Sequence, residues 1–246
     1  MEDSAGKKML RFLLKSFVEP ETTGDQPAVS GAAIVDLRDK TKASHCRVDL
    51  NQPLLNTRFV VFDTETTGLH PFGGDEITSI GAVVIENGEL RRDLTYHQLV
   101  NPYRSIPRIA TEITGITEEM VAGQPDVFEA LRSFLDFARD SVLVAHNSDF
   151  DLNFINLKLR KFCKTKIQHN TLDTMVMGMS LYPSEPNHTL DYMCAKHSIT
   201  VIDRHTALGD ALITAELFLE FLYMLHKRSI NTLKDLYSFL HWKSFI

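Results

Sequence analysis

The chain has 246 residues, of which 43% are hydrophobic and 24% charged, an ordinary composition for a globular protein. The length allows one domain of typical size together with an additional segment. No stretch approaches the roughly 18 consecutive apolar residues of a membrane-spanning helix, and the first residues lack the apolar region of a signal peptide. We therefore expect no membrane span and a cytoplasmic location, in which the three cysteines are reduced thiols.

The formal net charge is −6 at pH 7. Proteins that bind nucleic acid through its phosphates are usually basic, so this charge by itself argues against such a partner. The argument loses force if the acidic residues cluster. A site that holds divalent cations needs several carboxylates, and the bound cations reverse the local sign of the charge.

Residues 1–57 are interpreted as an N-terminal extension. The stretch 7–18 combines basic and apolar residues and predicts an amphipathic helix, and the prolines and glycines of 19–31 mark a linker. Three interpretations of 7–18 remain open: packing on the rest of the protein, docking of a partner, or contact with anionic lipid. Packing or docking is preferred over a membrane, because the stretch carries only four cations.

A regular pattern begins at residue 58. Apolar runs predict strands at 58–63 and 76–86, and the hairpin signal Asn87-Gly88 predicts a third strand at about 89–100. Hydrophobic spacing then predicts, in order, helix 124–139, strand 141–146, and helices at about 149–161, 171–182, 188–196, 206–226 and 229–240. This order predicts an α/β domain over 58–246, with a mixed sheet covered by helices.

Two acids, Asp63 and Glu65, stand at the end of the first strand. Side chains two residues apart on a strand point to the same face, and two carboxylates on one face repel unless a cation lies between them. Gly68, in the turn that follows, lets the backbone come close to a ligand. The alternative interpretation is an acidic strand end followed by a polar turn.

Acids also follow the strand at 141–146. Asp149 and Asp151 come where this strand ends, and ligand sites in α/β sheets favour the carboxyl ends of strands. They cannot both face the same way if a helix begins here, and Asp149 also fits an exposed place in the first helical turn. His146 and Asn147 have two open interpretations, which are stiffening the turn and contacting a substrate.

His205 and Asp210 form the third group. If a helix begins near Thr206, Asp210 lies in its second turn and His205 in the loop that enters it. Four converging carboxylates need compensation, and two divalent cations would supply it while clamping a phosphodiester and activating a water. Oxygen ligands with partial water shells fit Mg²⁺ or Mn²⁺, and a histidine suits proton abstraction from that water.

The segments FDTETTGL (62–69), HNSDFD (146–151) and HTALGD (205–210) resemble, in this order, the three motifs of the DEDDh group of DnaQ-like 3′→5′ exonucleases. The resemblance covers about residues 57–240, and within the family the chain is similar to the epsilon-type proofreading subunits of bacterial DNA polymerase III. It implies a ribonuclease H-like fold, with a mixed five-stranded sheet flanked by helices. Thr114 stands where many family members have histidine, which leaves nucleotide contacts in that loop open.

The resemblance also implies a role for individual residues. It makes Asp63, Glu65, Asp151 and Asp210 the metal-binding acids and His205 the general base, with Glu65 also orienting the attacking water. The residues that it places around the terminal nucleotide are Thr66, Thr67, Gly68, Leu69, Asn147 and Phe150.

By this resemblance, the expected activity is hydrolysis at nucleic-acid 3′ ends with two Mg²⁺ (or Mn²⁺) ions and release of nucleoside 5′-monophosphates. DNA is preferred over RNA and single-stranded DNA is favoured, in repair or proofreading, with a DNA polymerase subunit as a candidate partner of residues 1–57. Three alternatives stay open: an exoribonuclease that processes RNA 3′ ends, a polymerase-associated binding subunit, and a binding module without catalysis. The sequence does not indicate an oligomeric state.

Overall fold

The computed structural model describes residues 31–43 and 49–243. The expected helix at 7–18 and nearly all of the expected linker at 19–31 lie outside the described residues. Within the described part of the chain, no helix is both long and apolar enough to cross a membrane. The division of the chain at residue 57 stays a prediction.

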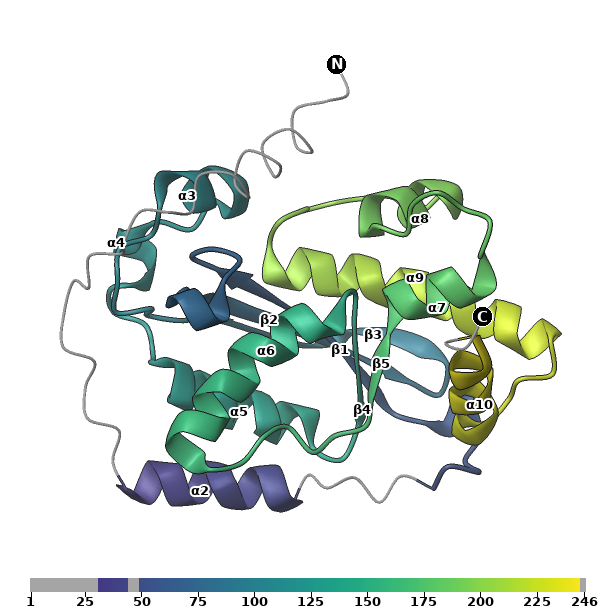
Figure 1. The fold of residues 1–246 in the computed structure, drawn as a ribbon, viewed down its shortest axis with the longest axis horizontal. Coiled ribbons are helices and arrows are strands. Elements are labelled where there is room, and N and C mark those ends of the chain that lie inside the picture. Colours follow the sequence, from purple (N-terminus) through teal and green to yellow (C-terminus); the bar gives the residue numbers. More distant parts are fainter. Residues whose placement is uncertain (1–30, 44–48, 244–246) are drawn as a thin grey trace.

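A five-stranded mixed sheet forms the centre of the molecule, in the order β3-β2-β1-β4-β5 (Figure 1). The strands are β1 (Phe59–Thr66), β2 (Ile77–Glu86), β3 (Glu89–Leu99), β4 (Val142–Ala145) and β5 (Thr171–Asp173). Neighbours among β1, β2 and β3 run antiparallel, whereas β4 runs parallel to both β1 and β5. The hairpin from β2 to β3 turns at Asn87 and Gly88, both with positive φ, as a type I′ turn requires. The predicted mixed sheet is confirmed.

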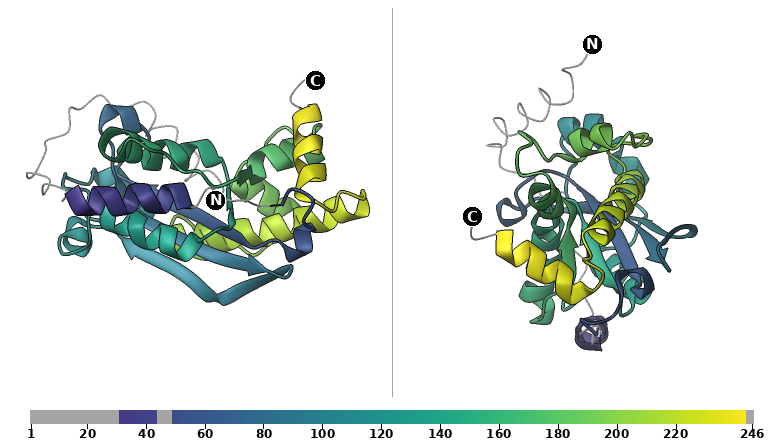
Figure 2. Two further views of the ribbon diagram at one scale, coloured as in Figure 1. Left: turned by 90° about the horizontal axis from the view of Figure 1, so that it is seen from below. Right: turned by 90° about the vertical axis from the view of Figure 1, so that its right-hand side faces the viewer.

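Helices cover both faces of this sheet. The helices of the described residues are α2 (Gly31–Ala43), α3 (Arg108–Thr114), α4 (Glu118–Val121), α5 (Val127–Ala138), α6 (Ser148–Lys158), α7 (Thr174–Leu181), α8 (Leu190–Lys196), α9 (Ala207–Lys227) and α10 (Leu233–Lys243), together with the short 3₁₀ helices η1 (Leu54–Asn56) and η2 (Pro71–Gly73) and the π-helix η3 (Leu159–Cys163). Figure 1 shows α2 lying beside α5. Figure 2 shows α10 standing across the end of the long α9.

Alternate residues of β1 face the two helical layers. Val60 and Phe62 belong to a core shared with α2, α5 and α6, whereas Phe59 and Val61 belong to a core shared with α7, α8, α9 and α10. The ring of Phe59 lies 4.9 Å from the ring of Phe218 in α9, measured between centroids. Burial on both faces explains why β1 is a continuous apolar run rather than an alternating one.

The structure differs from the sequence prediction in three places. Residues 171–173, expected to be helical, form the edge strand β5, and α7 begins only at Thr174. A strand of three residues is too short to show a period of two. The helix α2 lies in one segment, and the helices α3 and α4 lie in another, for which no element was predicted. α2 is anchored by Leu37, which is buried in the core on the α5 side, so a tertiary contact that the local pattern does not reveal holds this helix in place.

Candidate metal centre

Asp63 and Glu65 lie near the end of β1, on the face of the sheet that α9 covers. They continue the alternation of Phe59 and Val61, whose side chains contact the α9 layer. Asp63 pairs with β2 opposite Gly81, and the register becomes irregular directly after Glu65. The two acids therefore share a face, as their spacing predicted, at the point where regular pairing stops.

Asp210 reaches the same place from the first turn of α9, and not from the second turn as predicted. The helix begins after Thr206, whose side-chain oxygen accepts a hydrogen bond from the Gly209 N–H at 3.1 Å. The first turn lies directly on β2 at Gly81, where an added Cβ would come within 2.2 Å of the backbone of Ala207. Only glycine permits this approach, so Gly81 opposite Asp63 sets how close Asp210 comes to the strand.

Oxygen atoms of Asp63, Glu65 and Asp210 lie within 4.8 Å of one another. Burial raises the pKa of Asp63 well above its usual range, and Asp151, Glu65 and Asp210 raise it further. Burial and then Asp210 raise the pKa of Glu65 to about 8, and burial raises that of Asp210 to about 6. Three converging carboxylates that resist losing their protons form an oxygen-only donor set, which suits a hard divalent cation.

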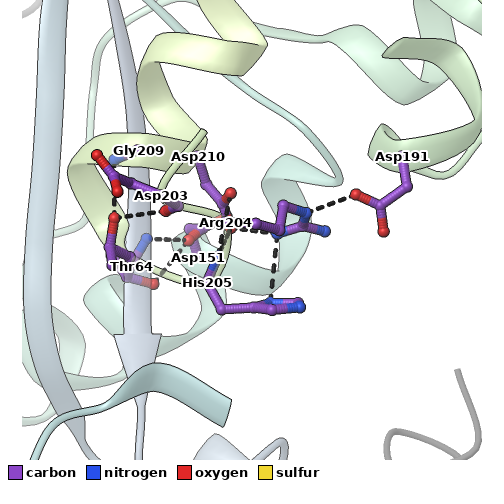
Figure 3. Close-up of polar contacts among 9 residues, drawn as sticks. Thr64, Asp151, Asp191, Asp203, Arg204, His205, Gly209 and Asp210 are labelled. Atoms are coloured by element: carbon purple, nitrogen blue, oxygen red, sulfur yellow. Dashed lines mark hydrogen bonds and ion pairs between the residues drawn. The ribbon is translucent and has the colours of Figure 1, made fainter. Parts of the chain in front are cut away.

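Asp151 approaches from the other face of the sheet, in the first turn of α6. Its Oδ1 accepts hydrogen bonds from the Thr64 backbone N–H at 2.9 Å and from the Thr64 hydroxyl at 2.6 Å (Figure 3). Burial raises the pKa of Asp151 to about 7, against the lowering effect of these bonds. The structure thus places Asp151 near Asp63, whose pKa it raises, but outside the group of three whose oxygens converge.

His205 lies in the loop that enters α9, in a left-handed backbone conformation with φ of 64°. Its backbone N–H donates to Oδ2 of Asp210 at 3.3 Å. Its ring lies beside the guanidinium of Arg204, with 3.4 Å between Nδ1 and Nη1 (Figure 3). Because Arg204 can only donate, Nδ1 accepts in this arrangement. Burial and then Arg204 lower the pKa of the imidazole, which keeps it neutral and able to take a proton.

Arg204 is a site residue that the sequence analysis missed. Its guanidinium forms ion pairs with Asp210 and with Asp191 of α8, the latter at 2.7 Å (Figure 3). It also lowers the pKa values of Asp63 and Glu65. In the sequence, only its position directly before His205 pointed to a role for Arg204. Its ion pairs with α8 and α9 depend on the tertiary structure.

Asn147 and His146 lie in the turn between β4 and α6. Asn147 is the N-cap residue in a left-handed conformation, without a side-chain cap bond. The Asp173 carboxylate instead accepts from the backbone N–H groups of Asn147 and Ser148, at 3.0 and 2.8 Å. The His146 ring lies 2.9 Å from the Thr174 hydroxyl, and burial lowers its pKa to about 4. The turn is therefore stiffened from β5, while the Asn147 side chain is exposed.

The loop after β1 uses its threonines internally. The Thr66 hydroxyl donates to the carbonyl of Gly68 at 2.6 Å, and Thr67 Oγ1 accepts from the Glu76 N–H at 3.0 Å. A Cβ on Gly68 would lie 2.3 Å from the carboxylate of Asp75. Thr66, Thr67 and Gly68 are buried, so the two threonine side chains hold the loop, whereas Leu69 is half-buried.

The chain resembles known exonucleases and DNA polymerase III proteins. Residues 60–218 match the family model RNase_T, described as an exonuclease. The chain is 45% identical over 182 residues to a DNA polymerase III subunit epsilon-like protein of Rhodobacter capsulatus and 39% identical over 181 residues to a PolC-type DNA polymerase III of Thermotoga petrophila. These matches cover 73% and 74% of this chain but only 26% and 13% of the relatives, so the chain corresponds to a small part of each.

Two solved structures share the fold. Exonuclease X, solved in complex with duplex DNA that has a 5′ overhang, is 26% identical with a TM-score of 0.55, covering 68% of this chain and 92% of that one. The nuclease domain of 3′hExo, a DEDDh family member bound to rAMP, is 18% identical with a TM-score of 0.59, covering 70% of this chain and 95% of that one. The latter likeness supports the fold alone.

Proposed function

The chain belongs to the DnaQ-like DEDDh exonucleases of the RNase_T family, and on this premise we propose that it removes nucleotides one at a time from DNA 3′ ends with the help of two divalent cations. The observation that carries the proposal is the convergence of Asp63, Glu65 and Asp210 within 4.8 Å. Members of the family use divalent metals, and this donor set consists only of hard oxygen ligands. We propose Mg²⁺, with Mn²⁺ as an alternative.

In this proposal Asp63, Glu65 and Asp210 hold the cations, and Asp151 completes the site from α6. Divalent cations bound there would neutralise the carboxylates, lower the pKa of a bound water and stabilise the leaving oxygen. The raised pKa values support this role, because a cation returns the buried acids to their charged form. Without a cation, Arg204 supplies part of the compensating charge to Asp210.

His205 is proposed to take the proton of the attacking water, which Glu65 orients. The lowered pKa of the imidazole keeps it unprotonated near neutral pH, as a general base requires. The ring must leave the Arg204 guanidinium to act, because Nδ1 accepts from it in this structure. The backbone of this loop is held by the bond from the His205 N–H to Asp210, so the movement is one of the His205 side chain.

The terminal nucleotide is proposed to lie against the backbone of residues 66–69 and between Leu69, Asn147 and Phe150. DNA is proposed over RNA because the relatives that are 45% and 39% identical to this chain are named as DNA polymerase III proteins. The 3′hExo structure holds an adenosine ribonucleotide, so RNA 3′-end processing is the second candidate. Attachment to a polymerase through residues 1–57, a cytoplasmic location and repair or proofreading as the pathway remain parts of the proposal.

A digestion panel tests it. Single- and double-stranded DNA and RNA oligonucleotides, labelled at either end, are incubated with the full chain in Mg²⁺, in Mn²⁺ and in EDTA. We expect a ladder of 3′-shortened, 5′-labelled DNA, release of 5′-monophosphates, no products in EDTA, and no cleavage by Asp63→Ala. Equal activity of Asp63→Ala would refute the site, while faster degradation of RNA would favour the second candidate.

A further inference from the structure

A hollow of about 470 Å³ lies between the loop after β1 and helix α6. Leu69 and Phe72 line it from the loop, and Phe150 and Asn153 line it from α6. Both walls belong to segments that carry proposed metal ligands, since Leu69 is four residues beyond Glu65 and Phe150 directly precedes Asp151. Because Leu69 and Phe150 also border the proposed place of the terminal nucleotide, the hollow adjoins that place. Its size is in the range of pockets that hold small organic groups.

The loop that forms one wall is braced from beneath. Asp75 accepts hydrogen bonds from the His70 N–H at 3.0 Å, from the Thr67 hydroxyl at 3.2 Å and from Arg104 at 3.1 Å. Arg104 also donates to the carbonyl of Gly74. The Asp75 and Arg104 side chains are only 14% and 8% exposed, so this ion pair is held in one geometry. These hydrogen bonds hold the backbone of the loop that carries the outward-facing side chains.

Phe72 is the outermost of these side chains, with 76% of its surface exposed. It lies on the short turn η2, which contacts α6. Across the hollow, the Phe150 ring is fixed against Phe154, with 5.2 Å between ring centroids. An exposed ring on a rigid loop loses little conformational freedom when it stacks, which makes it suitable for binding a flat group.

We propose that Phe72 stacks on the base of the nucleotide that precedes the 3′-terminal one, an inference that rests on the proposed function. In this arrangement Leu69 lies between the two nucleotides. The terminal nucleotide is on the side of Leu69 that faces the metal-binding acids, and the hollow is on its other side. A strand whose last phosphodiester lies at Asp63 and Asp210 continues toward this hollow. Every base has a π face, so the contact favours unpaired strands without selecting a sequence.

The test compares Phe72→Ala and Phe72→Trp with the wild-type full chain on three substrates. These are a single-stranded DNA oligonucleotide, the same strand with an abasic penultimate position, and the p-nitrophenyl ester of thymidine 5′-monophosphate. Tyr223→Ala, which removes another exposed aromatic ring far along α9, is the matched control. Binding of the labelled oligonucleotide in Ca²⁺ is measured in parallel by fluorescence anisotropy.

We expect Phe72→Ala to lower kcat/KM on the intact oligonucleotide by about 10- to 100-fold, the effect of losing one stacked base. Phe72→Trp should retain activity, and Tyr223→Ala should match the wild type. The abasic strand should be cleaved equally slowly by wild type and Phe72→Ala, and the ester equally well.

Three results would overturn the inference. They are full activity of Phe72→Ala on the intact strand, the same loss on the ester as on the strand, and wild-type affinity of Phe72→Ala for the oligonucleotide. The last would assign the ring to a protein contact instead. If the wild type cleaves no substrate, the proposed function fails separately, and the anisotropy comparison still decides the role of Phe72.

Discussion

Glu65→Gln should stabilise the metal-free protein at neutral and alkaline pH. The pKa of Glu65 is raised to about 8 in the folded protein, from 4.5 in the unfolded chain. Between these two pH values the Glu65 carboxyl loses its proton in the unfolded chain but keeps it in the folded protein. The free energy of unfolding therefore falls as pH rises. Below pH 4.5 both states are protonated and the penalty vanishes. Glutamine has the shape of the protonated acid and does not ionise in either state, so the stability of Glu65→Gln lacks this pH dependence.

The magnitude follows from the width of this window. One proton contributes about 1.4 kcal/mol per pH unit, so Glu65 alone costs about 3 kcal/mol at pH 7. The side chain keeps some access to solvent, which makes this an upper limit. For a chain of this length it corresponds to a rise in Tm of up to about 6–12 °C in Glu65→Gln.

Thermal unfolding in EDTA from pH 5 to pH 8 measures the effect. The wild-type Tm should fall with rising pH, whereas the Glu65→Gln curve should be flatter and should approach the wild-type curve only at the acid end of this range. Asp149→Asn removes the same formal charge from an exposed position on α6 and should change Tm little. In saturating Mg²⁺ the order should reverse, because the cation stabilises the folded wild type more strongly. A Glu65→Gln protein that is no more stable than the wild type at pH 8 in EDTA would refute the argument.

Three further outcomes follow from the site. His205→Ala should slow the chemical step about 10²–10⁴-fold in single-turnover cleavage while Mn²⁺ affinity is kept, and an unchanged rate would remove His205 as general base. Gly81→Ala places a Cβ against the backbone of α9 and should lower Tm and weaken Mn²⁺ binding in calorimetry, by about 1–3 kcal/mol of stability or more. Gly123→Ala, with open space around its Cβ, is the control that should behave as wild type. Arg204→Gln should tighten Mn²⁺ binding about tenfold by removing a cation that competes for Asp210; weaker binding would mean that Arg204 orients the carboxylate instead.

The sequence predicts most of the site because its elements leave local signals. An apolar run that ends at Asp63 identifies the central strand, and alternation places Glu65 on the same face. Thr206 before an apolar periodic stretch marks the start of α9, which the structure places at Ala207. These features depend on the period of a single strand or helix, and such periods are visible without the rest of the fold.

Other features depend on contacts between distant segments and leave no such signal. The bridge from Arg204 to Asp191 joins two helices, and the bonds from Thr64 to Asp151 join residues 87 positions apart. The edge strand β5 has three residues, fewer than any period can identify. The exposure of Phe72 follows from the buried Asp75–Arg104 pair beneath its loop. Each of these features exists only when distant segments are packed together in the folded protein.

The proposed metal centre draws its acids from both faces of the sheet, and this explains why they lie where β1 ends. Asp63, Glu65 and Asp210 come from the α9 face, whereas Asp151 comes from the α6 face. Asp151 accepts hydrogen bonds from Thr64, the residue between Asp63 and Glu65. A continuous strand separates its two faces, so acids from both can meet only at its end. The pKa values of all four acids are raised, mainly by burial, so ionising them together is unfavourable in the metal-free protein. Two divalent cations would offset these four carboxylates, and the same ions would give an acidic protein its local attraction for a phosphodiester.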